Sequence, residues 1–119
     1  YVAGGLDYLK RGRAARERKT PQELLEGLDL SKPVIVMDHE PRQLQELAEA
    51  GADLDLSGHT HNGQIFPGNL TIGLFWENAY GCQEKDGMTS VVTSGIGVWG
   101  PNMRIGTDSE IVYVNVSFR

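Results

Sequence analysis

A strand–helix–strand pattern near the middle of the chain constrains the fold most. The run PVIVM (33–37) is short, apolar and rich in β-branched residues, which is typical of a strand buried on both faces. The segment PRQLQELAEAG (41–51) then predicts a helix that opens at Pro41 and is capped by the final glycine. The segment DLDLS (53–57) predicts a second strand. Together they predict a βαβ unit with parallel strands and a right-handed crossover.

A helix is predicted ahead of this unit, over TPQELLEGL (20–28). Thr20 suits the N-cap, Pro21 suits the first helical position, and Glu23 completes a capping box. No run of about 20 apolar residues, the length needed to cross a bilayer, is present.

The chain beyond the βαβ unit is rich in glycine and in residues that favour strands. Residues 80–94 predict a hairpin that turns at an Asp-Gly dipeptide, and residues 95–106 predict a loop. Residues 110–118 alternate like a half-buried terminal strand. One face of that strand would carry Val112, Val114, Val116 and Phe118. Residues 66–79 give no clear pattern. The predicted class is α/β: one βαβ unit followed by mainly antiparallel strands.

The three histidines all fall just beyond the two strands of the βαβ unit. His39 follows the first strand, and His59 and His61 follow the second, within GHTHNGQ. Because ligands gather beyond the carboxyl ends of parallel strands, we expect the three imidazoles at one edge of the sheet. Neutral imidazole is a common ligand of divalent metals, so the pattern favours a metal site. The alternative is a hydrogen-bonded pair of histidines that holds no metal.

Four carboxylates lie near these histidines in the sequence. Asp38 and Glu40 flank His39, and Asp53 and Asp55 precede the other two. Asp55 falls within a strand that we expect to be buried. Most acids of this kind are exposed, support a ligand or cap an element. The single cysteine excludes an internal disulfide and a cysteine-based zinc cluster.

The charge of the chain is unevenly distributed. The net charge is −5, yet residues 10–19 hold 6 of the 11 basic side chains. This basic block predicts a solvated helix or loop; the alternative is a surface that meets phosphates or anionic lipid. The acidic remainder argues against a nucleic-acid-binding module, so no nucleic-acid partner is predicted.

Three segments, taken in order, resemble one known family. MDHEP (37–41), LSGHTHNGQ (56–64) and VVTSGIGVWGPNMRIGTDSEIVYV (91–114) resemble the C-terminal half of the calcineurin-like metallophosphoesterases. The likeness covers nearly the whole chain and is greatest to a bacterial branch associated with membranes or the cell envelope. It implies the C-terminal half of a four-layer α-β-β-α sandwich that holds two metals at the edge of a sheet.

The resemblance also implies roles for particular residues. His39 and His59 match ligands of one metal, and His61 matches a ligand of the other. The metals would be two divalent ions drawn from Mn, Zn, Fe or Mg. Asn62 replaces a commoner glycine. In the intact enzyme we expect Gln64 to line the phosphate pocket as an amide donor and Arg104 to contact the substrate; the alternative for Arg104 is an exposed or ion-paired side chain. No catalytic residue is assigned within this chain.

Other motifs of the family are absent from the sequence, namely D-x-H, GDxxD and GNH. We therefore expect residues 1–119 to be the C-terminal portion of a single domain whose N-terminal half is missing. The intact enzyme would be a metal-dependent phosphoesterase acting on phosphomonoesters, phosphodiesters or pyrophosphate bonds. Its substrate would be a phosphorylated small molecule or a lipid-linked one, in the bacterial cytoplasm or at the membrane or envelope, with membrane association through the missing N-terminus.

The isolated chain is expected to behave differently from such an enzyme. It lacks the bridging acid and should be inactive, and its unpaired edges should make it dimerise, swap strands or aggregate. Two alternatives stay open. One is a stand-alone module in which His39, His59 and His61 bind a single metal without catalysis. The other is a structural domain whose glycine-rich half presents a protein-binding surface.

Overall fold

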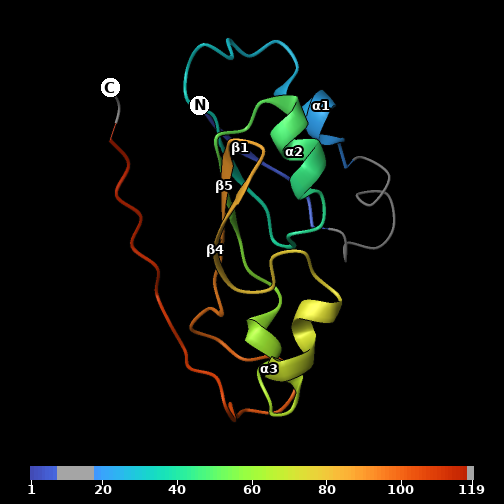
Figure 1. Cartoon of the computed structure of the whole chain (residues 1–119), viewed down its shortest axis with the longest axis vertical. Helices are drawn as coiled ribbons and strands as arrows, with labels where there is room; N and C mark the ends of the chain where they lie inside the picture. Colours follow the sequence, from blue (N-terminus) through green and yellow to red (C-terminus); the bar gives the residue numbers. More distant parts are fainter. Residues whose placement is uncertain (8–17, 118–119) are drawn as a thin grey trace.

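The computed structural model describes residues 1–7 and 18–117, and it contains a five-stranded mixed sheet (Figure 1). The strand order is β1-β2-β3-β5-β4. The strands are β1 (Val2–Gly4), β2 (Ile35–Met37), β3 (Leu54–Ser57), β4 (Gly81–Lys85) and β5 (Met88–Val92). Neighbours are parallel except β4 and β5, which are antiparallel. The α/β class is confirmed. Most of the basic block lies outside the described residues.

The predicted βαβ unit is present as β2, α2 (Leu44–Ala50) and β3, with β2 and β3 parallel. Gly51 ends α2 in the left-handed region at φ 97°, and its N–H donates to Ala48 O. The predicted opening at Pro41 is wrong. The Arg42 N–H donates to Glu40 O at 2.9 Å, so the chain makes a tight turn there and the helix begins three residues after the proline.

The predicted capping box of the preceding helix is confirmed. In α1 (Pro21–Leu25), Thr20 Oγ1 accepts from the Glu23 N–H, and the Glu23 carboxylate accepts from the Thr20 N–H. The helix is shorter than predicted, because the chain turns before Gly27, which adopts φ 79°.

One face of the sheet packs against α1 and α2, which lie together on that side (Figure 1). The buried core consists of Leu25, Val34, Val36, Leu44, Leu47, Ala52 and Met88. The prediction that 33–37 is buried on both faces is wrong, because Met37 is 53% exposed and Ile35 is only half-buried. No described helix covers that second face.

An extended segment, residues 110–117, runs along the second face instead (Figure 1). The predicted terminal strand is wrong, because no described residue pairs with this segment in a ladder. The alternation itself holds: Val112, Val114 and Val116 are less exposed than Ile111 and Tyr113. The valines line grooves against the sheet, so side-chain packing holds the segment there. Phe118 lies outside the described residues.

The predicted hairpin is confirmed, with Asp86 and Gly87 at its turn, both at positive φ. The region without a sequence pattern, 66–79, forms α3 (Gly68–Thr71) and a 3₁₀ turn (Ile72–Leu74). No helix among the described residues is long and apolar enough to span a membrane.

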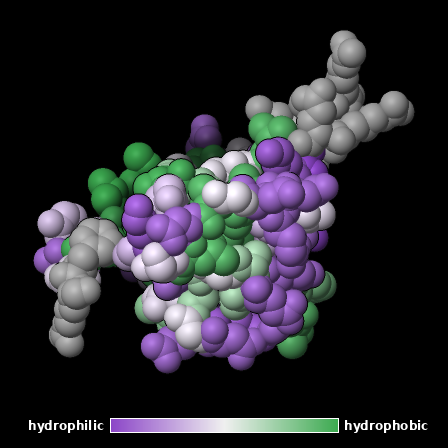
Figure 2. Space-filling model, turned by 90° about the horizontal axis from the view of Figure 1, so that it is seen from above, coloured by the Kyte–Doolittle hydropathy of each residue, from purple (hydrophilic) through white to green (hydrophobic). Residues whose placement is uncertain are grey.

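Apolar side chains remain exposed on several parts of the surface. Figure 2 shows apolar patches bordered by polar residues at one end of the molecule. Over the described residues as a whole, the most exposed apolar side chains are Leu70, Leu74, Phe75, Ile96, Ile111 and Tyr113. Exposed apolar surface of this kind favours contacts with other chains. Dimerisation or strand exchange by this chain therefore stays a prediction.

Substitutions at neighbouring positions of β2 test the one-sided burial. Val36→Ala should lower the free energy of unfolding by about 2–3 kcal/mol, because Val36 is fully buried and its loss leaves a cavity. Met37→Ala should lower it by less than about 1 kcal/mol. Urea denaturation measures both. Equal losses would mean that both faces of β2 are buried.

Candidate metal centre

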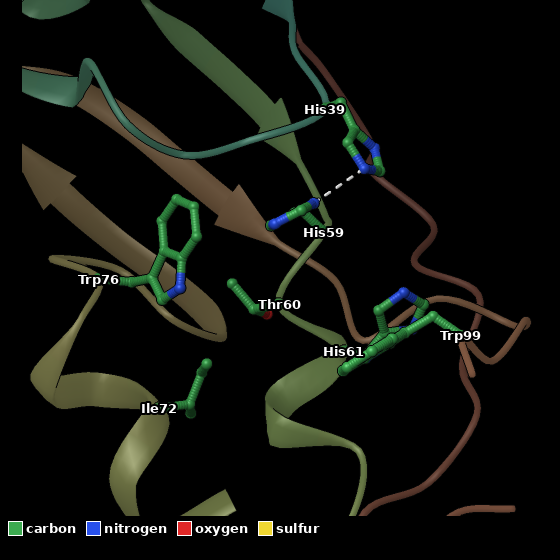
Figure 3. Close-up of a pocket in the computed structure, with 7 residues that line it drawn as sticks. All are labelled: His39, His59, Thr60, His61, Ile72, Trp76 and Trp99. Carbon is green, nitrogen blue, oxygen red and sulfur yellow. Dashed lines mark hydrogen bonds between the residues drawn. The ribbon is translucent and has the colours of Figure 1, made fainter. Parts of the chain in front are cut away.

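The loops that follow β2 and β3 bring His39 and His59 into contact (Figure 3). His59 Nδ1 and His39 Nε2 lie 3.0 Å apart, and the two rings meet edge to face. The register explains this contact, since Met37 pairs with Leu56 and the two chains leave the sheet side by side. The predicted convergence at the sheet edge is confirmed for this pair.

His61 lines the same pocket but makes different contacts. Its Nδ1 lies 3.4 Å from Arg104 Nη2, and its carbonyl accepts from Arg104 Nη1 at 3.2 Å. The pocket has a volume of about 440 Å³. Ile72 and Trp76 line one side, and His61 and Trp99 line the other (Figure 3). The structure thus places the three histidines around one pocket and brings two of them into contact.

The backbone around these histidines is unusual. His59, His61, Asn62 and Gln64 all adopt positive φ, between 47° and 67°. For a residue with a side chain this conformation costs about 1–2 kcal/mol, so surrounding contacts must hold it. Gly63 is required for a second reason, because a Cβ there would overlap the backbone of Gly68. The GHTHNGQ motif therefore encodes a shaped loop as well as two imidazoles.

The Gln64 side chain holds this loop against the loop formed by residues 95–106. Gln64 is 2% exposed. Its Nε2 donates to Trp99 O at 2.8 Å, and its Oε1 accepts from the Trp99 N–H at 2.9 Å. The Gln64 carbonyl also accepts from the Ile105 N–H. Both polar atoms of the side chain are thus engaged with backbone groups.

Arg104, which lies in the 95–106 loop, bonds both within this loop and to the loop that carries His61. Its Nη2 donates to the carbonyls of Ser94, Gly95 and Gly97 at 2.6–3.0 Å, and its Nη1 donates to the His61 carbonyl. These contacts give Arg104 and Gln64 a positioning role, and direct substrate contact by either residue stays a prediction. Sequence reasoning missed this role, because their backbone partners lie far along the chain.

Two of the four nearby carboxylates are fully buried, Glu40 and Asp55, and the burial of Asp55 was expected from its place in a strand. Glu40 is 2% exposed and pairs with Arg42. Its Oε1 lies 3.9 Å from His59 Nε2. Asp38 pairs with Arg18, and Asp53 accepts from the Val34 N–H.

Asp55 is the second buried acid, and it lies in a polar cluster between β3 and β5. It accepts from Ser57 Oγ at 2.9 Å and from Ser90 Oγ at 3.1 Å, and Asn78 Nδ2 donates to Ser90 Oγ. Burial raises the pKa of Asp55 to about 6, although the bonds from Ser57 and Ser90 oppose the rise. No sequence pattern indicated a role for Ser90 or Asn78.

Two imidazoles of the site, those of His59 and His61, have lowered pKa values. Burial lowers the pKa of His59, and the nearby Glu40 only partly offsets this. Burial also lowers the pKa of His61, and the Arg104 guanidinium lowers it further. Both rings therefore keep a lone pair to a lower pH than an ordinary histidine, as metal binding requires.

The described residues gather too few ligands for a complete metal site. No three His, Cys, Asp or Glu side chains in 1–7 and 18–117 are close enough together to hold an ion. His39 and His59 nevertheless fit two positions on one divalent cation. Two nitrogens bound to a single zinc at about 2.1 Å lie roughly 3–3.4 Å apart, close to the separation of this pair.

Several proteins are similar to this chain in sequence. A Helicobacter pylori protein named an uncharacterized metallophosphoesterase is 39% identical over 119 residues, covering 97% of this chain and 31% of that protein. One of the same name from Aquifex aeolicus is 36% identical over 96 residues, covering 79% of this chain and 36% of that protein. A transmembrane protein with metallophosphoesterase domain from Danio rerio is 35% identical over 98 residues, covering 78% of this chain and 22% of that protein.

The matches include bacterial and vertebrate proteins, so they do not fix a bacterial origin. The chain spans about a third of the length of the first relatives it matches. No family model matches the chain, and no solved structure does.

The buried Asp55 should make stability depend on pH. Its pKa in the folded protein, about 6, lies above the ordinary 3.8, so the folded state holds the proton more tightly. The free energy of unfolding should therefore fall as pH rises from about 4 to 6, by at most about 3 kcal/mol from this group. Asp55→Asn should remove that part of the fall.

Urea titrations of both proteins at about pH 4 and about pH 7 measure the difference. Glu84→Gln, which changes an exposed carboxylate on β4, serves as the control and should follow the unmodified chain. A difference between Asp55→Asn and the unmodified chain that does not vary with pH would contradict the assignment.

Proposed function

We propose that this chain, which is homologous to part of the metallophosphoesterases, supplies metal ligands for the hydrolysis of phosphate esters or pyrophosphate bonds. His39 and His59 would hold one divalent ion, and His61 would hold a second. The main support is the 3.0 Å contact between His39 and His59 beyond two adjacent parallel strands. The family resemblance assigns these same two histidines to one metal and assigns His61 to the other.

The residues of the chain would bind and orient the ions. A pair of divalent ions, when bound, lowers the pKa of a water and neutralises charge on the phosphoryl oxygens. Imidazole ligands suit Zn, Fe and Mn better than they suit Mg. The left-handed loop fixes where His59 and His61 present their lone pairs. Gln64 and Arg104 join the 95–106 loop to this left-handed loop at the side of the pocket.

The apolar side chains that line the pocket indicate which substrates would fit. Ile72, Trp76 and Trp99 line the pocket together with the three histidines. A phosphate directed toward the imidazoles would place its organic group against these apolar side chains, which also exclude water. This arrangement supports a phosphorylated small molecule with an apolar or aromatic part, or a lipid-linked phosphate.

The remaining ligands would come from outside these 119 residues. The chain spans about a third of its first relatives, and the described residues gather too few ligands for a complete site. We therefore take residues 1–119 as a C-terminal portion of one metallophosphoesterase domain. The stand-alone alternative, one ion bound by three histidines, finds less support, because His61 faces Arg104 and not the other pair.

Metal binding by the chain tests the ligand assignment. Zn²⁺ or Mn²⁺ should raise the melting temperature, because the ion binds only the folded arrangement, and a chelator should reverse the rise. His59→Ala should abolish the shift. Asn62→Gly should keep it, because Asn62 lies in the same loop, supplies no proposed ligand and adopts positive φ.

The same binding should depend on pH. Since burial lowers the pKa of His59 and of His61, both rings stay neutral at about pH 6.5, and metal affinity should fall only below that value. Titration calorimetry across this range measures it. No metal-induced shift for the unmodified chain, or an equal shift for His59→Ala, would remove the basis of the proposal.

Metal binding by the chain alone does not imply catalytic turnover by the chain alone. With only part of the ligand set, it should hydrolyse an aryl phosphodiester with added Mn²⁺ no faster than buffer does. A colorimetric assay measures this, with His59→Ala as the comparison. Hydrolysis above background that His59→Ala removes would show that 119 residues suffice.

A further inference from the structure

We propose that Glu40 is a positioning residue for His59, and that its carboxylate fixes the imidazole proton on Nε2. This directs the Nδ1 lone pair of His59 toward His39 and toward the cation that the pair would share. The inference rests on the proposed function of the site, and it adds a residue to which the family resemblance gave no role.

The observation behind it is a buried carboxylate oxygen that lacks a hydrogen bond. The Glu40 side chain is inaccessible to solvent, and its Oε2 accepts from Arg42 Nε. Its Oε1 is buried and has no hydrogen-bond partner among the described residues. Buried polar atoms are nearly always hydrogen-bonded, so an orphan oxygen points to a contact that completes in another state.

The nitrogen placed to complete it is His59 Nε2, at 3.9 Å. This separation exceeds a hydrogen bond by about 1 Å, so a small rotation of either side chain would close it. Histidines that bind metals usually donate their other ring N–H to a carboxylate or a carbonyl. Glu40 thus stands where such a partner is needed.

The charge of Glu40 selects one tautomer. An ionised carboxylate can only accept, so a lone pair on Nε2 would face it unfavourably, whereas a proton on Nε2 meets it favourably. Nδ1 of His59 then carries the lone pair and accepts from His39 Nε2 across 3.0 Å. To share a cation with His59, His39 would instead carry its proton on Nδ1, so that its Nε2 also presents a lone pair.

Neighbouring groups confine the imidazole in this orientation. The Trp76 ring lies 5.4 Å from the His59 ring, and the Arg42 guanidinium lies 4.8 Å above Trp76. Arg42 therefore links the carboxylate to the indole that flanks the histidine. Glu40 and Trp76 thus both lie beside the His59 ring.

Nitrogen NMR of the metal-free chain with ¹⁵N-labelled histidine tests the tautomer directly. His59 should carry its proton on Nε2 in the unmodified chain. Glu40→Gln should keep that state, because its amide oxygen also accepts. Glu40→Met fills a similar volume without an acceptor and should shift His59 toward a mixture of tautomers. Glu46→Gln, which changes an exposed carboxylate on α2, serves as the control and should match the unmodified chain.

Metal affinity gives a second measure. Glu40→Met should weaken Zn²⁺ binding by about 10–100-fold, whereas Glu40→Gln should stay within roughly threefold of the unmodified chain. If Glu40 served packing alone, Glu40→Met would change neither the tautomer of His59 nor the affinity for Zn²⁺. If Glu40→Met fails to fold, the tautomer of the unmodified chain decides, and a proton on Nδ1 overturns the inference.

The two proposals fail in different ways. If the unmodified chain binds no Zn²⁺ yet His59 is protonated on Nε2 and responds to Glu40→Met, the ligand assignment fails and the role of Glu40 stands. If Zn²⁺ binds through His59 but the tautomer ignores Glu40, only the positioning role fails.

Discussion

The left-handed backbone at residues 59–64 has to be held in place, and the geometry of the site depends on how this is done. His59, His61, Asn62 and Gln64 adopt positive φ there, and each costs about 1–2 kcal/mol relative to an ordinary conformation. Gln64 offsets this cost by bonding to Trp99 in the 95–106 loop, and Arg104 offsets it by donating from that loop to the His61 carbonyl. Those bonds align the two loops, and the aligned loops place His61 and Trp99 beside the same pocket.

The sheet beneath these loops has two unlike faces. The face toward α1 and α2 combines an apolar core with the polar cluster of Asp55, Ser57, Ser90 and Asn78. Because Asp55 pairs with Ser90 across β3 and β5, a shift of one residue would separate the carboxylate from its donors. The buried acid thus costs stability at neutral pH but fixes the register, and this register sets where His59 leaves the sheet.

Local sequence signals predicted much of this fold, but they did not predict the contacts between residues that are distant in sequence. The capping box at Thr20 and the turn at Asp86 depend on adjacent residues, so the sequence alone was sufficient. The prediction of a terminal strand was wrong because alternation shows which side chains face inward. It does not show whether the backbone forms hydrogen bonds with a neighbouring strand. The tie between Gln64 and Trp99 spans 35 residues, and nothing in either local pattern indicates it. The burial of Glu40 was missed for the same reason.

The two halves of the histidine site differ in charge, which bears on how ions would occupy it. His59 has the buried carboxylate of Glu40 behind it, so a cation at His39 and His59 meets compensating negative charge. His61 has the Arg104 guanidinium at 3.4 Å, which repels a second cation and attracts a phosphate. A cation at His61 therefore needs an added anionic ligand. The bridging aspartate implied by the family resemblance would supply one, so the charges favour the first ion at His39 and His59.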